Sequence, residues 1–237
     1  GVASSDVGIF YIALMISMYV GSLISSMAYM VVPASTMSKT DLSFTSSRIA
    51  LSLTAPLIAG LVAAPQLVLS VIGAEYTAGE SLLVVLAIAI LPFSVVTNAI
   101  SKFNYLCHAR KLLAIGSIQV SVFLIAFFAL VPYYQTLGAS ISILLAYSAA
   151  SIPVIFWTER ALTRYIANSG LAIMIGGISG FGLSLLGTSL VVQFVSLVIS
   201  IAIALVLIIA LKNTSINEIR ELIRSSVKNT VQSKAID

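Results

Sequence analysis

The sequence predicts an all-α integral membrane protein with about seven transmembrane helices, and three observations lead to this prediction. Hydrophobic residues make up 59% of the 237 residues and charged residues only 8%, whereas an average soluble domain carries about 25% charged residues. The mean hydropathy is +1.12. The apolar runs continue for about 20 residues and more, which favours membrane helices over the shorter alternating strands of a barrel. Lipid must therefore surround most of the chain.

Uncharged runs place the spans, each close to the roughly 20 residues that cross a bilayer core. Pro33 ends the first run and Pro132 ends the fourth. No charge occurs from residue 170 to residue 211, and one helix of that length would measure about 60 Å, so the chain must fold back near Gly187 and Thr188. The predicted spans are residues 7–32, 49–72, 81–101, 112–131, 138–158, 170–187 and 189–211, and residues 212–237 form a tail.

The basic residues test this count, because they mark the cytoplasmic loops of membrane proteins. All twelve lie on alternate connections or in the tail: Lys39, Arg48, Lys102, Arg110, Lys111, Arg160, Arg164, Lys212, Arg220, Arg224, Lys228 and Lys234. This pattern predicts a multi-pass protein of the cytoplasmic membrane with its N-terminal end outside and its C-terminus inside. The acidic stretch "VIGAEYTAGESLL" then falls outside, as a helix–helix turn in which Gly73 permits the bend and Glu75 caps the next helix.

Two further segments have a predicted role in packing or at the membrane surface. Gly176 and Gly180 are spaced so that a second helix can approach closely, and packing is the favoured interpretation. The tail segment "SINEIRELIRSSVKN" combines an apolar stripe with a basic one, so it forms an amphipathic helix that lies on an anionic leaflet or packs on its own protein.

The sequence lacks the residue patterns of an enzyme. No Asp, Glu, Lys, Arg or His falls inside the seven predicted runs, which also argues against an ion-coupling site in this part of the chain. There is no zinc-ligand spacing, no pair of neighbouring carboxylates and no phosphate-binding glycine loop. We therefore expect no catalytic residues, no metal and no cofactor, and no nucleic acid as a partner.

The polar groups inside the membrane are hydroxyls and amides, and they supply the candidate substrate contacts. Ser17, Gly21, Ser25 and Tyr29 advance in steps of four along the first span, so they are expected to share one face. That face lines a water-filled cavity or packs against another helix, and the sequence leaves both open. Asn98 lies in a polar cluster near the end of the third span.

Cations at the cytoplasmic mouth complete the set of candidates. A phosphate-bearing head group is costly to bury unless its charge is paired, and the nearest cations are Arg48, Lys102 and Arg110. These residues either attract such a head group or only follow the positive-inside rule. The predicted substrate-binding residues are Arg48, Lys102, Arg110, Asn98, Ser17, Ser25 and Tyr29.

The order of several short motifs resembles a known transporter family. These are the opening "SSDVGIFYIALMIS", the helix end "VVPASTMS", the turn "SVIGAEYTAGESLL", the basic "NAISKFNYLCHARK" and the turn "VPYYQTLGASIS". The series is similar to that of the polysaccharide and oligosaccharide-lipid flippases of the multidrug/oligosaccharidyl-lipid/polysaccharide exporter superfamily. The residues that match are Gly8, Tyr11, Ala13, Pro33, Gly73, Glu75, Tyr76, Pro132, Gly138 and Ala139, while the glycine that usually follows the tyrosine of the last turn is missing.

The resemblance covers roughly residues 1–150 and implies a two-lobe helical bundle that works by alternating access. Seven spans that start outside would correspond to the eighth to fourteenth helices of such a flippase, so the N-terminal lobe of the same protein would be a missing partner. The implied substrate is a lipid-linked oligosaccharide or polysaccharide precursor, and membrane lipids are the other partners. The alternatives are a multidrug or small-solute antiporter of the same superfamily and a structural membrane subunit without a transport path.

Overall fold

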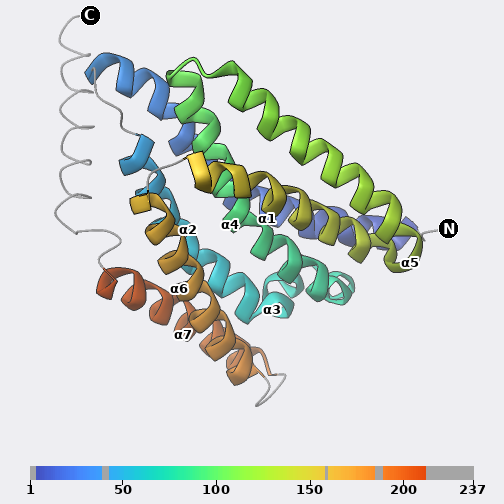
Figure 1. Cartoon of the computed structure of the whole chain (residues 1–237). Coiled ribbons are helices and arrows are strands. Elements are labelled where there is room, and N and C mark those ends of the chain that lie inside the picture. Colours follow the sequence, from blue (N-terminus) through green and yellow to red (C-terminus); the bar gives the residue numbers. More distant parts are fainter. Residues whose placement is uncertain (1–3, 39–42, 158–159, 185–188, 212–237) are drawn as a thin grey trace, which may run out of the picture.

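The computed structural model describes residues 4–38, 43–157, 160–184 and 189–211, and the described part is helical (Figure 1). The helices are α1 (Ser4–Ser38), α2 (Ser43–Ala63), α3 (Pro65–Ser70), α4 (Glu80–Tyr105), α5 (Ala109–Trp157), α6 (Arg160–Ser184) and α7 (Leu190–Ala210), with a 3₁₀ helix, η1 (Ala74–Gly79), before α4. Six helical segments among the described residues are long and apolar enough to cross a membrane. The all-α membrane fold predicted from composition is confirmed.

The longest of these helices, α5, is a hairpin that supplies two of the predicted spans. The backbone leaves helical geometry at Gln135, where φ is 49° and ψ is −124°. The two arms then lie side by side, because Lys111 near the start of α5 is 5.7 Å from the ring of Trp157 at its end. With α5 counted twice, the described helices make seven crossings, as predicted. The predicted stop at Pro132 is wrong, because the chain reverses three residues later.

The hairpin turn depends on Gly138, which packs against the backbone of the first arm of α5. A Cβ atom placed on Gly138 would lie 2.6 Å from the carbonyl oxygen of Leu130 and 2.9 Å from the amide nitrogen of Val131. Any side chain at this position would push the two arms apart.

The other prolines also act differently from the prediction. Helix α1 continues through Pro33 to Ser38 instead of ending before it. The predicted second span is instead broken, since α2 ends at Ala63 and Pro65 opens the short α3. Proline lacks an N–H group and so removes one helical hydrogen bond, but whether the helix continues or breaks depends on its neighbours. The predicted amphipathic tail lies outside the described residues.

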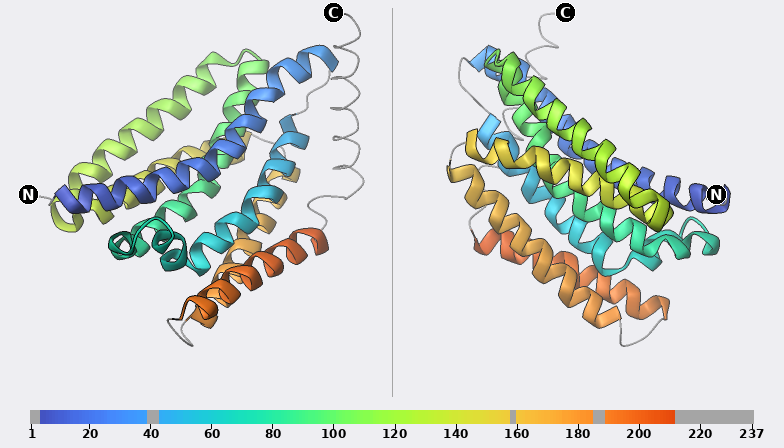
Figure 2. Two further views of the ribbon diagram at one scale, coloured as in Figure 1. Left: turned by 180° about the vertical axis from the view of Figure 1, so that it is seen from behind. Right: turned by 45° about the vertical axis from the view of Figure 1, so that its right-hand side comes forward.

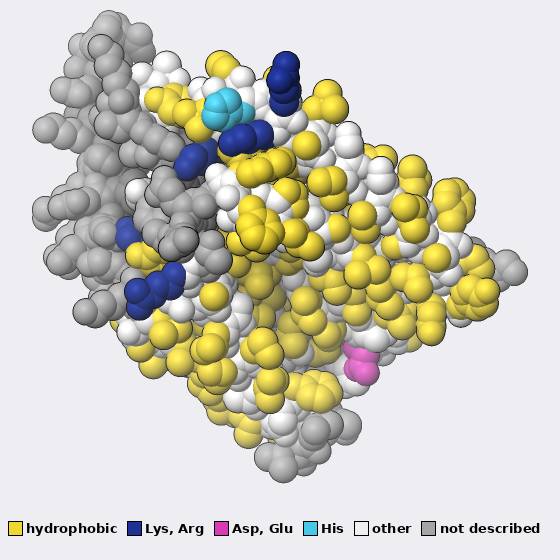
Figure 3. All heavy atoms as spheres, viewed as in Figure 1, with side chains coloured by type: hydrophobic (Ala, Val, Ile, Leu, Met, Phe, Trp, Pro, Cys, Tyr) yellow, Lys and Arg dark blue, Asp and Glu magenta, His cyan; other side chains and the backbone are white. Residues whose placement is uncertain are grey.

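The helices form a bundle in which α2 and α4 are central (Figures 1 and 2). Helix α4 packs against α1, α2 and both arms of α5, while α2 packs against α6 and α7. Basic side chains gather at one end of the face shown in Figure 3, and an acidic side chain lies toward the opposite end. The described part of the chain is therefore polarised along its length.

The tightest packing joins α2, α6 and α7 at small residues. A Cβ atom on Gly180 would overlap that of Ala63 and lie 2.8 Å from that of Ser200, and one on Gly176 would lie 3.0 Å from the carbonyl oxygen of Ser200. The Ser200 hydroxyl shares its proton between the carbonyl oxygens of Ala59 at 3.0 Å and Gly176 at 2.7 Å. The sequence-based assignment of Gly176 and Gly180 to helix packing is confirmed.

Replacement of Gly180 by alanine tests this contact. We expect Gly180→Ala to lower the free energy of unfolding by about 2 kcal/mol, because overpacking typically costs about 1–3 kcal/mol. Gly182 is the matched control, since a Cβ atom there meets nothing within 4 Å. The measurement is the thermal unfolding of the purified protein in detergent. Equal midpoints for Gly180→Ala and Gly182→Ala would contradict the close approach.

Candidate functional site

The polar residues of α1 do not share one face, which corrects the expectation from their spacing. Ser17 is only 6% exposed, Ser25 is half-buried and Tyr29 is 74% exposed. Steps of four residues rotate each position by about 40°, so the series turns by about 120° between Ser17 and Tyr29. The predicted stripe therefore starts inside the bundle and ends on its surface.

The buried part of this series belongs to a packed layer that crosses the bundle. A Cβ atom on Gly21 would lie 3.2 Å from the ring of Phe93 on α4. Phe93 in turn stacks edge-on against Tyr147 on the second arm of α5, with ring centroids 5.2 Å apart. The Tyr147 side chain is hydrogen-bonded to Gln119 on the first arm. At this depth the inner face of α1 is a packing surface.

A different face of α1 is exposed and polar, and we call it the α1 outer face. Its hydroxyl-bearing residues lie at helical spacing along the span and are Tyr11, Tyr19, Ser22, Ser26 and Tyr29, with the exposed apolar residues Met18, Leu23 and Met30 beside them. The three tyrosines are 54%, 73% and 74% exposed. The serine hydroxyls donate to carbonyl oxygens of their own helix, at 2.6 Å for Ser22 and 2.8 Å for Ser26.

Helix α7 has the opposite polarity. Its exposed side chains are apolar: Leu190, Val191, Phe194, Val195, Val198, Leu205, Val206 and Ile209. Its polar side chains point inward, where Ser196 donates to the carbonyl oxygen of Gly180 and Gln193 donates to Gln66. Such a helix is suited to contact with lipid, because its hydroxyls and amides are satisfied inside the protein. The α1 outer face is not built in this way.

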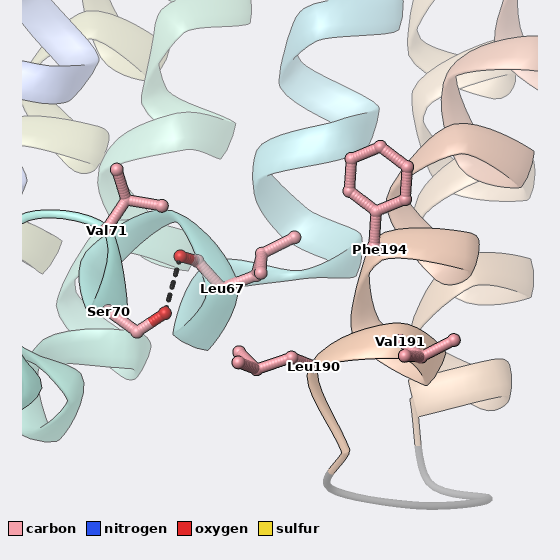
Figure 4. A pocket seen from close by; sticks show the side chains of 6 residues that line it. All are labelled: Leu67, Ser70, Val71, Leu190, Val191 and Phe194. Carbon is pink, nitrogen blue, oxygen red and sulfur yellow. Dashed lines mark hydrogen bonds between the residues drawn. The ribbon is translucent and has the colours of Figure 1, made fainter.

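The groove between α3 and α7 has an apolar surface, like the outer side of α7. It is lined by Leu67, Ser70, Val71, Leu190, Val191 and Phe194 (Figure 4). The one hydroxyl among these side chains turns back to its own helix, since Ser70 donates to the carbonyl oxygen of Leu67 at 2.8 Å. This groove offers no polar contact for a sugar or a phosphate.

The predicted cations lie together at one end of the bundle but on separate elements. Arg48 near the start of α2 is half-buried, with its guanidinium carbon 5.6 Å from the ring centre of Tyr165. Lys102 lies in the last turn of α4 and is half-buried, whereas Arg110 near the start of α5 is exposed. The start of α2 adjoins α1 near Tyr29, since the Ser46 hydroxyl donates to the Met27 carbonyl at 3.2 Å. Arg48 and Tyr29 therefore belong to the same end of the bundle.

The acidic stretch at the other end is a turn, but not the one predicted. Gly73 has an extended φ of 171°, which any residue adopts, and no side chain caps η1 or α4, so the predicted cap by Glu75 is wrong. A Cβ atom on Gly73 would meet only the end of the Glu75 side chain, at 2.8 Å, whereas one on Gly79 would lie 2.5 Å from the side chain of Ile9 on α1. Glu80 opens α4 and accepts a hydrogen bond from Gln66 on α3.

Three glutamines form cross-helix contacts that the sequence reasoning missed. Gln193 binds Gln66 at 3.0 Å, Gln66 binds Glu80, and Gln119 binds Tyr147. A neutral amide inside an apolar run was the available signal, because amides in membrane helices hydrogen-bond between helices. Among the amides, Asn98 was predicted as a substrate contact, whereas no role was predicted for Gln66, Gln119 or Gln193.

Asn98 differs from these amides because its polar atoms are only partly satisfied. The side chain is 4% exposed, and its Nδ2 donates to the carbonyl oxygen of Ser94 at 2.8 Å. Its Oδ1 is buried and has no hydrogen-bond partner among the described residues. A buried acceptor without a partner costs about 1–3 kcal/mol. Asn98 is therefore a polar group that packing does not explain.

Comparisons with known proteins add no assignment. No family model, curated protein or solved structure matches the chain. Among the described residues, no group of three or more His, Cys, Asp or Glu side chains could hold a metal ion. The geometry of α1, Asn98 and the basic end is thus the basis for a functional proposal.

The unsatisfied acceptor of Asn98 can be tested by measuring stability. We expect Asn98→Leu, which keeps the size of the side chain, to raise the free energy of unfolding by about 1 kcal/mol by removing the unsatisfied acceptor. The measurement is thermal unfolding in detergent. Asn104→Leu at an exposed position of the same helix is the control and should leave stability nearly unchanged. A loss of stability in Asn98→Leu would show that Oδ1 is satisfied in the protein.

Proposed function

We propose that this chain forms part of a transporter that moves a lipid-linked oligosaccharide or polysaccharide precursor across the cytoplasmic membrane. The observation that carries the proposal is the α1 outer face, whose tyrosines and serines stay exposed along a helix long enough to span the membrane. Exposed hydroxyl groups are unfavourable against lipid tails but suit a water-filled path. The substrate's polar head would move along this face while its lipid tail stays in the bilayer.

The motif series supports the same proposal. It resembles the lipid-linked glycan flippases of the exporter superfamily, and four of its matched positions, Gly8, Tyr11, Ala13 and Pro33, belong to α1. Alternating access is the mechanism that this resemblance implies. No bond is made or broken, so the protein needs only to bind the head group, expel it and hold it away from the hydrocarbon core.

The path itself can be tested by modification of single cysteines in a Cys107→Ser background. We expect a hydrophilic thiol reagent to react with a cysteine in Ser22→Cys on the α1 outer face, and a bulky adduct there to stop glycan export. Val198→Cys is the control, because Val198 is 47% exposed on the apolar face of α7 and should be shielded from the reagent by lipid. The measurement is export in cells whose own copy of this gene is deleted.

The possible outcomes discriminate between functions. Reaction at Ser22→Cys without loss of export would leave a water-accessible face that is not the substrate path. Protection of Ser22→Cys to the same degree as Val198→Cys would contradict a water-filled path and favour a helix-packing surface.

We also propose that the N-terminal end lies outside the cell and the C-terminus inside, because Arg48 lies near the start of α2 and Lys102, Arg110 and Lys111 lie where α4 ends and α5 begins, on alternate connections. The native Cys107 is exposed in the link between α4 and α5. We expect a membrane-impermeant maleimide to label it only in permeabilised cells. Thr77→Cys in a Cys107→Ser background should instead be labelled in intact cells, and the reverse pattern would contradict this orientation.

A further inference from the structure

The link between α4 and α5 concentrates positive charge at one end of the bundle. Lys102 lies in the last turn of α4, His108 ends the link, and Arg110 and Lys111 lie in the first turn of α5. We call these four residues the basic turn. No acidic residue occurs in the sequence from residue 81 to residue 158, which includes all of α5 as far as Trp157.

Hydrogen bonds fix the shape of the basic turn. Cys107 adopts the left-handed conformation with φ of 55°, and its N–H donates to the carbonyl oxygen of Asn104 at 3.1 Å. The next N–H, of His108, donates to the carbonyl oxygen of Phe103 at 2.8 Å. This pattern closes the C-terminus of α4 in the manner of a Schellman motif. The exposed side chains of His108 and Arg110 are thereby held on a defined backbone.

Aromatic rings place the basic turn at the membrane boundary. The ammonium of Lys111 lies 5.0 Å from the ring centre of the buried Phe103 and 5.7 Å from that of Trp157. Tryptophan is enriched at the level of lipid head groups, where its ring is partly in water. Trp157 is 38% exposed, as such a position requires. A basic turn beside such a ring fits the depth of lipid phosphates.

An apolar face begins directly beside these cations and continues along the first arm of α5. Leu113, Val120, Leu124 and Phe128 lie on one face of the helix and are 72%, 58%, 46% and 72% exposed. The combination of cations at the boundary and an apolar strip below them matches an amphipathic anion. A soluble anion would make no use of the strip.

We propose that the basic turn binds the phosphate of an anionic phospholipid, with an acyl chain along this strip of α5. Arg110 can hold phosphate oxygens through two N–H groups and His108 can donate a ring N–H, while Lys111 adds positive charge from its place over the rings of Phe103 and Trp157. The N-terminus of the α5 helix, which begins at Ala109, favours a negative group at the same place. This site goes beyond the proposed transport function, because it concerns a lipid that stays bound and not the substrate that moves.

The test is lipid binding by the complete chain, purified in a neutral detergent and titrated with phosphatidylglycerol or phosphatidylcholine. Native mass spectrometry counts the bound lipids. We expect a phosphatidylglycerol adduct that Arg110→Gln weakens about fivefold and Arg110→Gln with Lys111→Gln about 25-fold, following the usual contribution of each surface cation. Arg110→Lys should weaken binding less than Arg110→Gln, since it keeps the charge.

Arg164→Gln is the matched control, because Arg164 is also an exposed cation of the described chain but lies on α6. It should leave the adduct unchanged. An equal loss in Arg164→Gln and Arg110→Gln would overturn the proposal in favour of diffuse attraction. Competition by millimolar inorganic phosphate would overturn it in favour of a free-anion site, and equal binding of both lipids would overturn it in favour of purely apolar contact.

Discussion

The hydrogen bonds from one hydroxyl group, that of Ser200, hold three helices at their closest approach. Its single proton is shared between a carbonyl oxygen of α2 at 3.0 Å and one of α6 at 2.7 Å. Helices in lipid gain little from the hydrophobic effect, so they associate through close packing and hydrogen bonds. Both require that Gly176 and Gly180 carry no side chain where α7 passes. Because α7 satisfies its polar groups inward, its outer side is left entirely to apolar residues.

The same requirement explains why α1 has the opposite arrangement. Its inner side is occupied by apolar contacts, with Phe93 against Gly21 and Ile9 against Gly79. Its remaining hydroxyls therefore lie on the side that no other described helix covers. Hydroxyls that bond to their own helix are not left without a partner, but each tyrosine adds a phenol hydroxyl that lipid tails do not solvate. The exposed polarity of α1 thus results from how α4 packs against it.

Much of this fold follows from the sequence, because the two signals used were global. Apolar run length and the alternation of basic residues predicted seven crossings, including the hairpin of α5 and the reversal between α6 and α7. The errors occur where a single residue has two possible effects. Pro33 lies inside a helix, Pro65 starts one and Pro132 precedes the break at Gln135, although each lies in an apolar run. Their outcomes depend on neighbouring helices that the sequence does not identify.

The candidate site was less predictable for a related reason. Spacing showed that α1 carries hydroxyls, but not which of them α4 covers, and Ser17 and Tyr29 therefore proved to lie in different environments. Gln66 and Gln193 are far apart in the sequence. They are in contact because Gln66 lies on α3, which is a separate helix from α2. A hydrogen bond across the bundle is a property of the packed helices, so composition and periodicity contain little information about it.

The two groups of helices are also held together by different forces, which has a consequence for the proposed transport. Helices α2, α6 and α7 are joined by hydroxyl-to-carbonyl hydrogen bonds, whereas the hydroxyls of Ser17, Ser22, Ser25 and Ser26 bond within α1 itself. Side-chain packing, such as that of Phe93 on Gly21, can be exchanged for similar packing after a small displacement, but a hydrogen bond in lipid must be broken and remade. The Ser46–Met27 contact ties α1 to α2 at the basic end. In the transport that we propose, α1 is the helix that moves, with this contact as its attachment and with α2, α6 and α7 as the rigid part.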